Sequence, residues 1–330
     1  MATNKVTTNL IDMSGNTGGL VWAKGTEAQR PGSPVAGDTR LNTTTSRLEF
    51  YNGTEWKRLN ESTGGPTVTF LADFLVLGGG GGSGASGGSS RDNLGGAGGA
   101  GGLRTSFGSA SGGPGAGGGS PAEAKTGIVT GTSYTVTVGA GGTEGTYTGS
   151  DNVPGFNGAD SVFSSITSLG GGGGGGRNQN GLNGGCGGGA GMGSSGYSGG
   201  SGSDYQGFGG ANGGNLTAGG GGGVGSASTG TSTGGGNGLS VSITGAAVTY
   251  GPGGNGGNQG DNADPSHAVN SGGGGMSGRF NAPGQSGIVI VRYPNTYTIT
   301  VGAGLTSSTA TDGSDKVTTF TAGTDTISFS

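Results

Sequence analysis

Residues 161–180 read SVFSSITSLGGGGGGGRNQN, and this stretch holds in order the three ingredients of most of the chain. A run of strand type, Ser161–Leu169, leads into seven consecutive glycines, Gly170–Gly176, and the polar turn Arg177-Asn178-Gln179-Asn180 follows. Glycine loses more backbone entropy on folding than any other residue, so a glycine run folds only where a regular arrangement offsets that cost. The fold therefore depends on what this glycine run becomes.

Glycine enrichment is regional, since 79 of the 92 glycines lie between Gly78 and Gly287. Collagen is excluded, because there is no strict Gly-X-Y period and the chain has only 10 prolines. The ordered alternative is a polyglycine helix of the polyproline II type, with about three residues per turn and a rise of about 3.1 Å per residue. Such helices make no internal hydrogen bonds and must be bundled. A disordered glycine-rich coat protein is the competing interpretation.

The same junction of apolar run and glycine run recurs through residues 64–293. Apolar runs of strand type lead into glycines at Val68–Leu77, Ser133–Val138 and Ala247–Tyr250, and Gly287–Tyr293 closes the region. This alternation predicts a β scaffold at one end, from which polyglycine helices extend and return. The turns predicted at the far end are Ser89–Leu94, Arg177–Asn183 and Asn258–Ser271, and an insert, Ser194–Phe208, could reach either end.

The first segment, residues 1–63, reads as a small β module. Asn52-Gly53 separates two alternating runs, which is typical of a hairpin with a type I′ turn. Leu48 and Phe50 share one face of the first run. A module of this size is marginally stable alone, so we expect oligomerisation or docking to support it.

The last segment, residues 294–330, is rich in Thr and Ser. Thr296–Val301, Val317–Phe320 and Thr324–Phe329 read as strands, with a turn at Gly323 between the last two. This pattern predicts a hairpin module or edge strands for a neighbouring subunit. The fold class is thus mainly β with little or no α: small β modules at both ends and a central bundle of polyglycine II helices on a β scaffold, with domains 1–63, 64–293 and 294–330.

The composition of the chain argues against nucleic-acid binding, a membrane span, a metal site and catalysis. The net charge of −4 gives no basic footprint for nucleic acid, and no stretch approaches the ~20 apolar residues of a membrane span. One histidine and one cysteine, Cys186, cannot supply a multi-His or multi-Cys metal site, and no phosphate-binding loop or nucleophile elbow is present. We therefore expect no enzyme, no catalytic residue, no metal and no cofactor.

Bulky polar residues gather in the predicted turns, where a rigid scaffold would present them for binding. Tyr mixed with Asn, Ser and Gly is also the composition of antibody binding loops. The alternative is that these turns only separate and solvate the helices. The candidate receptor-binding residues are Arg177, Asn178, Gln179, Asn180, Tyr197, Tyr205, Phe208 and His267.

Three motifs carry a resemblance to a known group of proteins. Phe74-Leu75-Val76-Leu77-Gly78-Gly79-Gly80 opens the glycine-rich region, Tyr134-Thr135-Val136-Thr137-Val138-Gly139-Ala140-Gly141-Gly142 lies within it, and Gly287-Ile288-Val289-Ile290-Val291-Arg292-Tyr293 closes it. This region resembles the glycine-rich domains of tailed-phage tail fibres and distal adhesins, in which a sandwich of polyglycine helices carries tip loops that select the host receptor. Leu48-Glu49-Phe50-Tyr51-Asn52-Gly53-Thr54-Glu55-Trp56 is similar to modules of virion fibre and decoration proteins, notably of marine phages.

The resemblance implies a protein of the virion surface, on the tail or the capsid exterior, and thus extracellular in its action. Residues 1–63 would attach to other virion proteins, and the tip loops would bind a host surface glycan or outer-membrane protein. Fibres of this kind are commonly homo-oligomers, so a trimer is expected by analogy. A capsid decoration or head-fibre protein, or an extracellular filament subunit, is the alternative.

Overall fold

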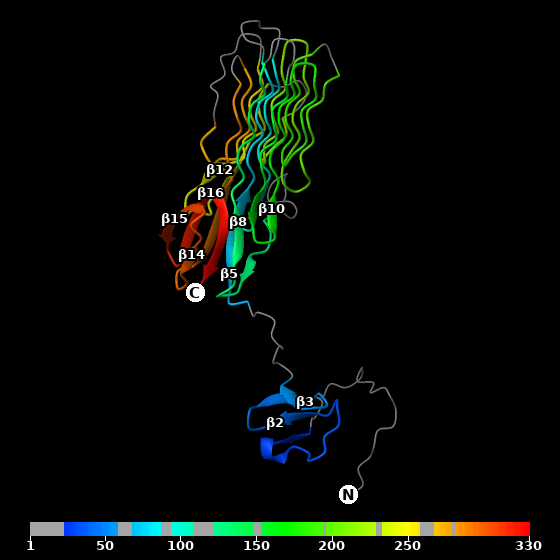
Figure 1. Ribbon diagram of the computed structural model, residues 1–330, viewed down its shortest axis with the longest axis vertical. Helices are drawn as coiled ribbons and strands as arrows, with labels where there is room; N and C mark the ends of the chain where they lie inside the picture. Colours follow the sequence, from blue (N-terminus) through cyan, green and yellow to red (C-terminus); the bar gives the residue numbers. More distant parts are fainter. Residues whose placement is uncertain are drawn as a thin grey trace. The chain divides into compact units, whose positions relative to one another are not determined.

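The computed structural model describes residues 23–58, 68–86, 94–108, 122–147, 153–193, 196–228, 233–257, 267–278 and 281–330. The chain divides into two compact units, Met1–Thr67 and Val68–Ser330 (Figure 1). The described residues form strands and extended runs with one short 3-10 helix, η1 (Glu27–Gln29), which confirms the mainly β prediction. The predicted turns Ser89–Leu94 and Asn258–Ser271 lie mostly outside the described residues.

The first unit holds a four-stranded sheet of order β1-β2-β3-β4, made of β1 (Lys24–Gly25), β2 (Thr39–Asn42), β3 (Arg47–Tyr51) and β4 (Trp56–Arg58). The hairpin predicted at Asn52-Gly53 is confirmed, because Tyr51 pairs with Trp56 across it. The prediction of a type I′ turn is wrong. Only Gly53 has positive φ, at 102°, and the Asn52 side chain closes a longer loop by accepting the N–H groups of Thr54 (2.9 Å) and Glu55 (2.8 Å).

The buried face of this sheet is polar. Arg40, Asn42 and Glu49 are each at most 5% exposed, whereas Leu48 and Phe50 on the other face are only half-buried. Alternation along β2 and β3 places the three polar residues together. Hydrogen bonds and ion pairs among them compensate their burial, as described below.

The second unit has a ten-stranded sheet whose main path is β10-β9-β8-β16-β13-β5-β6. The sheet curls until it is nearly closed, so that β10 at one end of this path comes next to β5. Ser168 Oγ of β10 donates to Val76 O of β5 over 2.7 Å. β14 and β15 pair with β16, β7 pairs with β5, and β11 and β12 form a separate hairpin. The strands are β5 (Phe70–Leu77), β6 (Leu103–Thr105), β7 (Thr126–Ile128), β8 (Tyr134–Thr137), β9 (Ser161–Phe163), β10 (Ile166–Ser168), β11 (Leu239–Val241), β12 (Val248–Tyr250), β13 (Ile288–Pro294), β14 (Ile299–Val301), β15 (Leu305–Asp312) and β16 (Asp315–Phe329).

The two central strands are buried on both faces, which explains their uninterrupted apolar sequences. In β5, Phe74 and Val76 join one hydrophobic cluster, while Leu75 and Leu77 join the second. The first cluster fills the curl of the sheet together with Phe163, Phe320 and Phe329. The second lies where the glycine runs begin and includes Cys186 and Tyr250.

Two predictions about strands are wrong. Residues 294–330 do not form a module of their own, because β16 lies inside the large sheet between β13 and β8 and continues as a strand through Gly323 (φ 99°). Ser161–Leu169 is not one strand but the hairpin β9–β10, which turns at Ser164 with φ 55°. At Gly323, pairing of β16 with the distant strands β13 and β8 overrides the local turn signal. At Ser164, a turn forms where the sequence has no glycine or proline to indicate it.

The glycine runs leave the sheet together and lie side by side (Figure 1), and their hydrogen bonds follow a period of three residues. Along 78–86, the N–H groups of residues 78, 81 and 84 donate to the run 96–102, those of 79, 82 and 85 donate to 153–159, and those of 80 and 83 donate to 282–285. A helix with three residues per turn produces this rotation of partners. The predicted bundle of polyglycine II helices is therefore confirmed.

Each inner helix is surrounded on all sides. The carbonyl oxygens of the run 78–86 accept N–H groups from three further runs, 142–145, 171–174 and Gly275, so this helix has six neighbours. A β-carbon at Gly80 would overlap the carbonyl oxygen of Gly273, and one at Gly81 would overlap that of Gly172. Close packing of backbone on backbone thus requires glycine at these positions, while Ser83 and Ala85 are accommodated fully buried at others on the same helix.

Candidate functional site

The turn Arg177–Asn180 lies at the end of the bundle away from the sheet, which we call the far end. It follows the run 170–176 directly, and the Gln179 N–H donates to Gly176 O over 3.0 Å to close it. Asn178 sits at φ 56°, a conformation that Asn tolerates better than most residues, and its N–H donates to Met192 O over 2.9 Å. The side chains of Asn178, Gln179 and Asn180 are exposed.

Tyr197 lies in the same region. Asn180 Oδ1 accepts the Ser198 N–H over 2.9 Å, and a β-carbon on Gly193 would lie 2.6 Å from the Tyr197 ring and 2.7 Å from Asn178 Oδ1. Gly193 therefore separates the aromatic ring from the amide. Beside them is an open cleft of about 370 Å³, lined by Gly196, Tyr197, Ser198, Asn212, Gly213, Gly214 and Asn215. Tyr197 is the one residue of this lining with an ionisable side chain.

Arg177 contributes the charge of this group. Its side chain is partly exposed, but its Nε is buried and has no hydrogen-bond partner among the described residues. A guanidinium has five N–H donors, so this one atom leaves a directed donor unused. We name Arg177, Asn178, Gln179, Asn180 and Tyr197, with the adjoining cleft, the far-end surface.

Tyr205 and Phe208 lie at the sheet end, apart from this surface. Tyr205 is exposed in the turn 204–206 at φ 64°, and the next residue, Gln206, accepts the N–H groups of Leu103 (3.0 Å) and Leu169 (2.9 Å). Phe208 O accepts the Gly187 N–H over 3.0 Å. The described part of the insert, residues 196–208, thus spans the bundle, with Tyr197 and Tyr205 at opposite ends.

His267 is also apart from the far-end surface. Its Nε2 lies 3.1 Å from Gly253 O, close to the start of the run that follows β12, and its ring covers Gly273. Burial lowers the pKa of His267, and the contact with the Gly253 backbone opposes that shift only in part. The ring therefore packs as a neutral side chain against the bundle.

A structural role of the asparagines was missed by the sequence analysis. The side-chain oxygens of Asn180 and Asn183 accept the N–H groups of Ser198 (2.9 Å) and Ser201 (2.7 Å) on the neighbouring run. On another run, Asn157 and Asp160 accept the N–H groups of Gly173 (2.9 Å) and Gly170 (2.8 Å) in the same way. Both pairs are three residues apart, which is one helical turn, so each pair covers one side of its helix. This three-residue spacing of Asn and Asp in the sequence could have indicated their structural role.

We expect Asn183→Ala to destabilise the bundle locally. It removes a hydrogen bond between exposed groups, so water replaces part of the lost bond and the cost is about 0.5–1 kcal/mol. Hydrogen exchange should become faster at Ser201 while the amides of β13 keep their protection. Asn178→Ala is the matched control, because the contact of Asn178 with Met192 runs through its backbone N–H. Equal exchange at Ser201 in both variants would contradict the role of Asn183.

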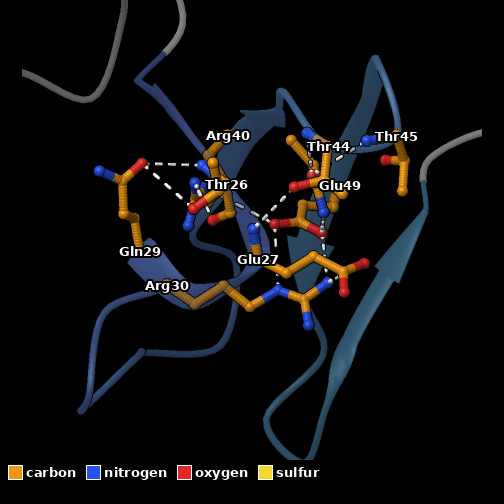
Figure 2. Close-up of polar contacts among 9 residues, drawn as sticks. Thr26, Glu27, Gln29, Arg30, Arg40, Thr44, Thr45 and Glu49 are labelled. Atoms are coloured by element: carbon orange, nitrogen blue, oxygen red, sulfur yellow. Dashed lines mark hydrogen bonds and ion pairs between the residues drawn. The ribbon is translucent and has the colours of Figure 1, made fainter.

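The first unit contains a second polar cluster, around the buried Glu49 carboxylate (Figure 2). Arg30 binds both of its oxygens, at 2.6 Å from Nη2 and 3.2 Å from Nε, and Asn42 Nδ2 donates to Oε2 over 2.9 Å. Arg40 Nε lies 3.6 Å from Oε1. These contacts, the hydrogen bonds from Arg30 first, hold the pKa of Glu49 below its ordinary value although burial opposes the shift.

This cluster predicts acid sensitivity of the first unit. Because the folded-state pKa of Glu49 is lowered, its contribution to stability is complete above the unfolded value, roughly pH 4.3, and is lost as the pH falls through the folded value. We expect protection of β2 and β3 amides from hydrogen exchange, corrected for the intrinsic rate, to weaken below about pH 4. Unchanged corrected protection down to about pH 2 would contradict this expectation.

Other chemical groups are sparse in the part of the chain that the structure describes. No cluster of three or more His, Cys, Asp or Glu side chains suited to a metal ion occurs there. Burial raises the pKa of the Cys186 thiol to about 12, so this thiol is protonated at neutral pH. Among the same residues, no helix has the length and apolar character needed to cross a bilayer.

Comparison with known proteins identifies the glycine-rich region. The family model described as "Glycine-rich domain" matches residues 61–294, which include the bundle and its sheet up to β13. Neither the curated proteins nor the solved structures contain a match to the chain. Since the matched residues make up well over half of the 330-residue sequence, the chain belongs to the glycine-rich domain family.

Proposed function

We propose that this protein is a phage virion surface protein, a tail fibre or receptor-binding adhesin that recognises a host cell-surface molecule without chemistry. The observation that supports this best is the far-end surface. It joins an arginine, exposed amides and a tyrosine-lined cleft at one end of a bundle of cross-bonded helices. A rigid scaffold of this kind holds the binding residues in place before they contact the receptor, which reduces the entropy lost on binding.

In this proposal each group has a definite task. Tyr197 stacks on a sugar ring or an apolar side chain, and Arg177 donates to an oxygen of the receptor through the exposed part of its guanidinium group. Asn180 uses Oδ1 within the bundle, and its Nδ2 group donates to the receptor. The receptor is a surface glycan or an outer-membrane protein, and residues 1–63 attach the protein, as a homo-oligomer and by analogy a trimer, to the virion.

Adsorption to host cells tests the assignment. Virions carrying Arg177→Ala with Tyr197→Ala should adsorb about ten-fold more slowly or worse, because aromatic and arginine side chains dominate binding energy at interfaces. Tyr205→Ala is the matched control, since Tyr205 is exposed at the opposite end of the bundle. Undiminished adsorption by the double variant, with normal incorporation into virions, would refute the far-end surface as the receptor site.

A capsid decoration or head-fibre protein, or an extracellular filament subunit, is the second candidate. It is favoured by the polar side chains that serve the bundle: Asn180 Oδ1 accepts Ser198 N–H, and Gln179 Oε1 accepts Gly176 N–H over 3.2 Å. In this alternative the glycine bundle is a spacer. Immunogold labelling on capsid faces or along a polymer, with none at tail tips, would establish it in place of the adhesin.

A further inference from the structure

The sequence contains seven Asn-Gly dipeptides, and the structure describes all of them. They begin at Asn52, Asn157, Asn180, Asn183, Asn212, Asn237 and Asn255. In such a dipeptide the glycine nitrogen can attack the side-chain amide carbon of the asparagine, because glycine has no β-carbon to hinder the approach. Ring closure needs a glycine nitrogen that is free to attack. It is faster where hydrogen-bond donors stabilise the negative charge that develops on the amide oxygen.

Five of the dipeptides lack a free glycine nitrogen, because the bundle uses it. The Gly181 N–H donates to Ser198 O over 3.0 Å, while Asn180 Oδ1 accepts the N–H of the same serine over 2.9 Å. The same two kinds of bond to a neighbouring run are made by the dipeptides that begin at Asn157, Asn183, Asn212 and Asn255. Each of these nitrogens must lose a hydrogen bond of the bundle before it can react.

Asn237-Gly238 meets the first requirement only. Asn237 is exposed, and the Gly238 N–H donates to no acceptor among the described residues. Within the same residues, no donor contacts the side-chain oxygen of Asn237, whose backbone N–H donates to Ser226 Oγ over 2.9 Å. Attack on this amide is therefore open, but only water can stabilise the charge on its oxygen.

Asn52-Gly53, in the loop between β3 and β4, meets both requirements. The two residues are exposed, and the Gly53 N–H has no acceptor in the part of the chain that the structure describes. Asn52 Oδ1 accepts the N–H groups of Thr54 (2.9 Å) and Glu55 (2.8 Å). Two backbone donors thus already point at the oxygen that becomes negative, as in an oxyanion hole. The Asn52 N–H donates to Glu55 O over 3.1 Å, which holds the loop in this form.

We propose that Asn52 is a site of self-catalysed deamidation. Hydroxide removes the Gly53 N–H proton, and the glycine nitrogen forms a bond to Asn52 Cγ while the Thr54 and Glu55 N–H groups stabilise the oxyanion. The bond from Cγ to the amide nitrogen then breaks, and ammonia leaves with a proton from water, which regenerates the hydroxide. Water opens the resulting succinimide at either carbonyl to give aspartate or isoaspartate.

The two products affect the loop differently. Aspartate keeps an acceptor for the Thr54 and Glu55 N–H groups and adds a negative charge. Isoaspartate inserts a methylene into the backbone directly after β3, where Tyr51 pairs with Trp56. We therefore expect aspartate to preserve the hairpin and isoaspartate to weaken it. The proposal concerns the first unit alone and does not depend on the adhesin assignment.

Mass spectrometry of peptides from the full chain, after incubation in mildly alkaline buffer, measures each dipeptide separately. Deamidation replaces NH₂ by OH and so raises the peptide mass. Asn52 should react about ten-fold faster than Asn237, less than a buried oxyanion hole contributes because water competes at this exposed site. The five dipeptides of the bundle should react more slowly than Asn237. A rate at Asn52 no higher than that at Asn237 would overturn the proposal.

The same incubation in concentrated guanidinium chloride separates the effect of the fold from that of the local sequence. All seven dipeptides then lose their hydrogen bonds, and Asn52 and Asn237 should react at similar rates. If Asn52 keeps its advantage in the unfolded chain, neighbouring residues and not the donors cause it, and the proposal is wrong. It is equally wrong if Asn52 reacts more slowly in the folded chain than in the denaturant, since the hairpin would then protect the amide.

Thr54→Pro tests the donors directly, because it removes one of the two N–H groups and leaves the reacting dipeptide unchanged. Deamidation of Asn52 should slow several-fold toward the rate of Asn237, with hydrogen exchange in β3 used to verify that the hairpin persists. An unchanged rate in the folded variant would refute the role of the oxyanion donors. If the variant does not fold, the comparison of Asn52 with Asn237 decides.

Discussion

Gly98→Ala is expected to destabilise the second unit severely. A β-carbon at Gly98 would overlap the carbonyl oxygen of Gly81, and its neighbours on that side are backbone atoms that cannot rotate away. The Gly98 N–H and C=O also bond to Gly275 (2.8 Å) and Gly254 (3.0 Å), so the helix cannot move aside without losing both bonds. We expect a loss of about 3 kcal/mol or more, at the upper end for overpacked sites.

Thermal unfolding followed by calorimetry measures this effect. A loss of that size corresponds to a decrease in Tm of roughly 6–12 °C for a domain of this length. Gly209→Ala is the matched control within the same bundle, because the nearest atom to its β-carbon would be 3.2 Å away and the next 3.9 Å. Its Tm should change by about 3 °C at most. Similar decreases in both variants would show that glycine acts there through backbone freedom and not through close packing.

Glu49→Gln is expected to unfold much of the first unit at neutral pH. The substitution keeps the shape of the side chain but removes the charge that Arg30 and Arg40 share, at a site that is 1% exposed. Breaking a buried ion pair by removing one partner costs about 3–5 kcal/mol. A unit of this size has little stability to lose, so the fraction unfolded should increase markedly.

Hydrogen exchange read by mass spectrometry on peptides from β2 to β4 detects this without interference from the second unit. Glu55→Gln provides the control, because the Glu55–Lys57 pair is also short, at 2.7 Å, but exposed, and such pairs contribute about 1 kcal/mol or less. Protection of β2 and β3 should disappear in Glu49→Gln and persist in Glu55→Gln. Full protection in Glu49→Gln would show that the apolar face, with Leu48 and Phe50, stabilises the sheet instead.

The sequence predicted the position of only some residues of the candidate site. Arg177–Asn180 was expected at a turn after a glycine run, and the structure has it there. Tyr197 and Tyr205 are eight residues apart by number, yet they lie at opposite ends of the bundle because a run of that length crosses it. The sequence also did not indicate which role each side chain has. An exposed asparagine such as Asn180 could equally be a receptor contact or the acceptor for the Ser198 N–H.

The amino-acid sequence by itself determined the repeating local structure. The extended helical conformation of the glycine runs follows from the freedom of the glycine backbone, and the uninterrupted apolar sequence of Phe70–Leu77 indicates a strand buried on both faces. Only the tertiary structure decided which partners meet. The Gly80 N–H donates to Gln285 O, and β16 pairs with β13 and β8 in the large sheet as well as with its hairpin partner β15. Glycine runs are nearly identical to one another, so their pairing depends on where the strands that carry them are held in the sheet.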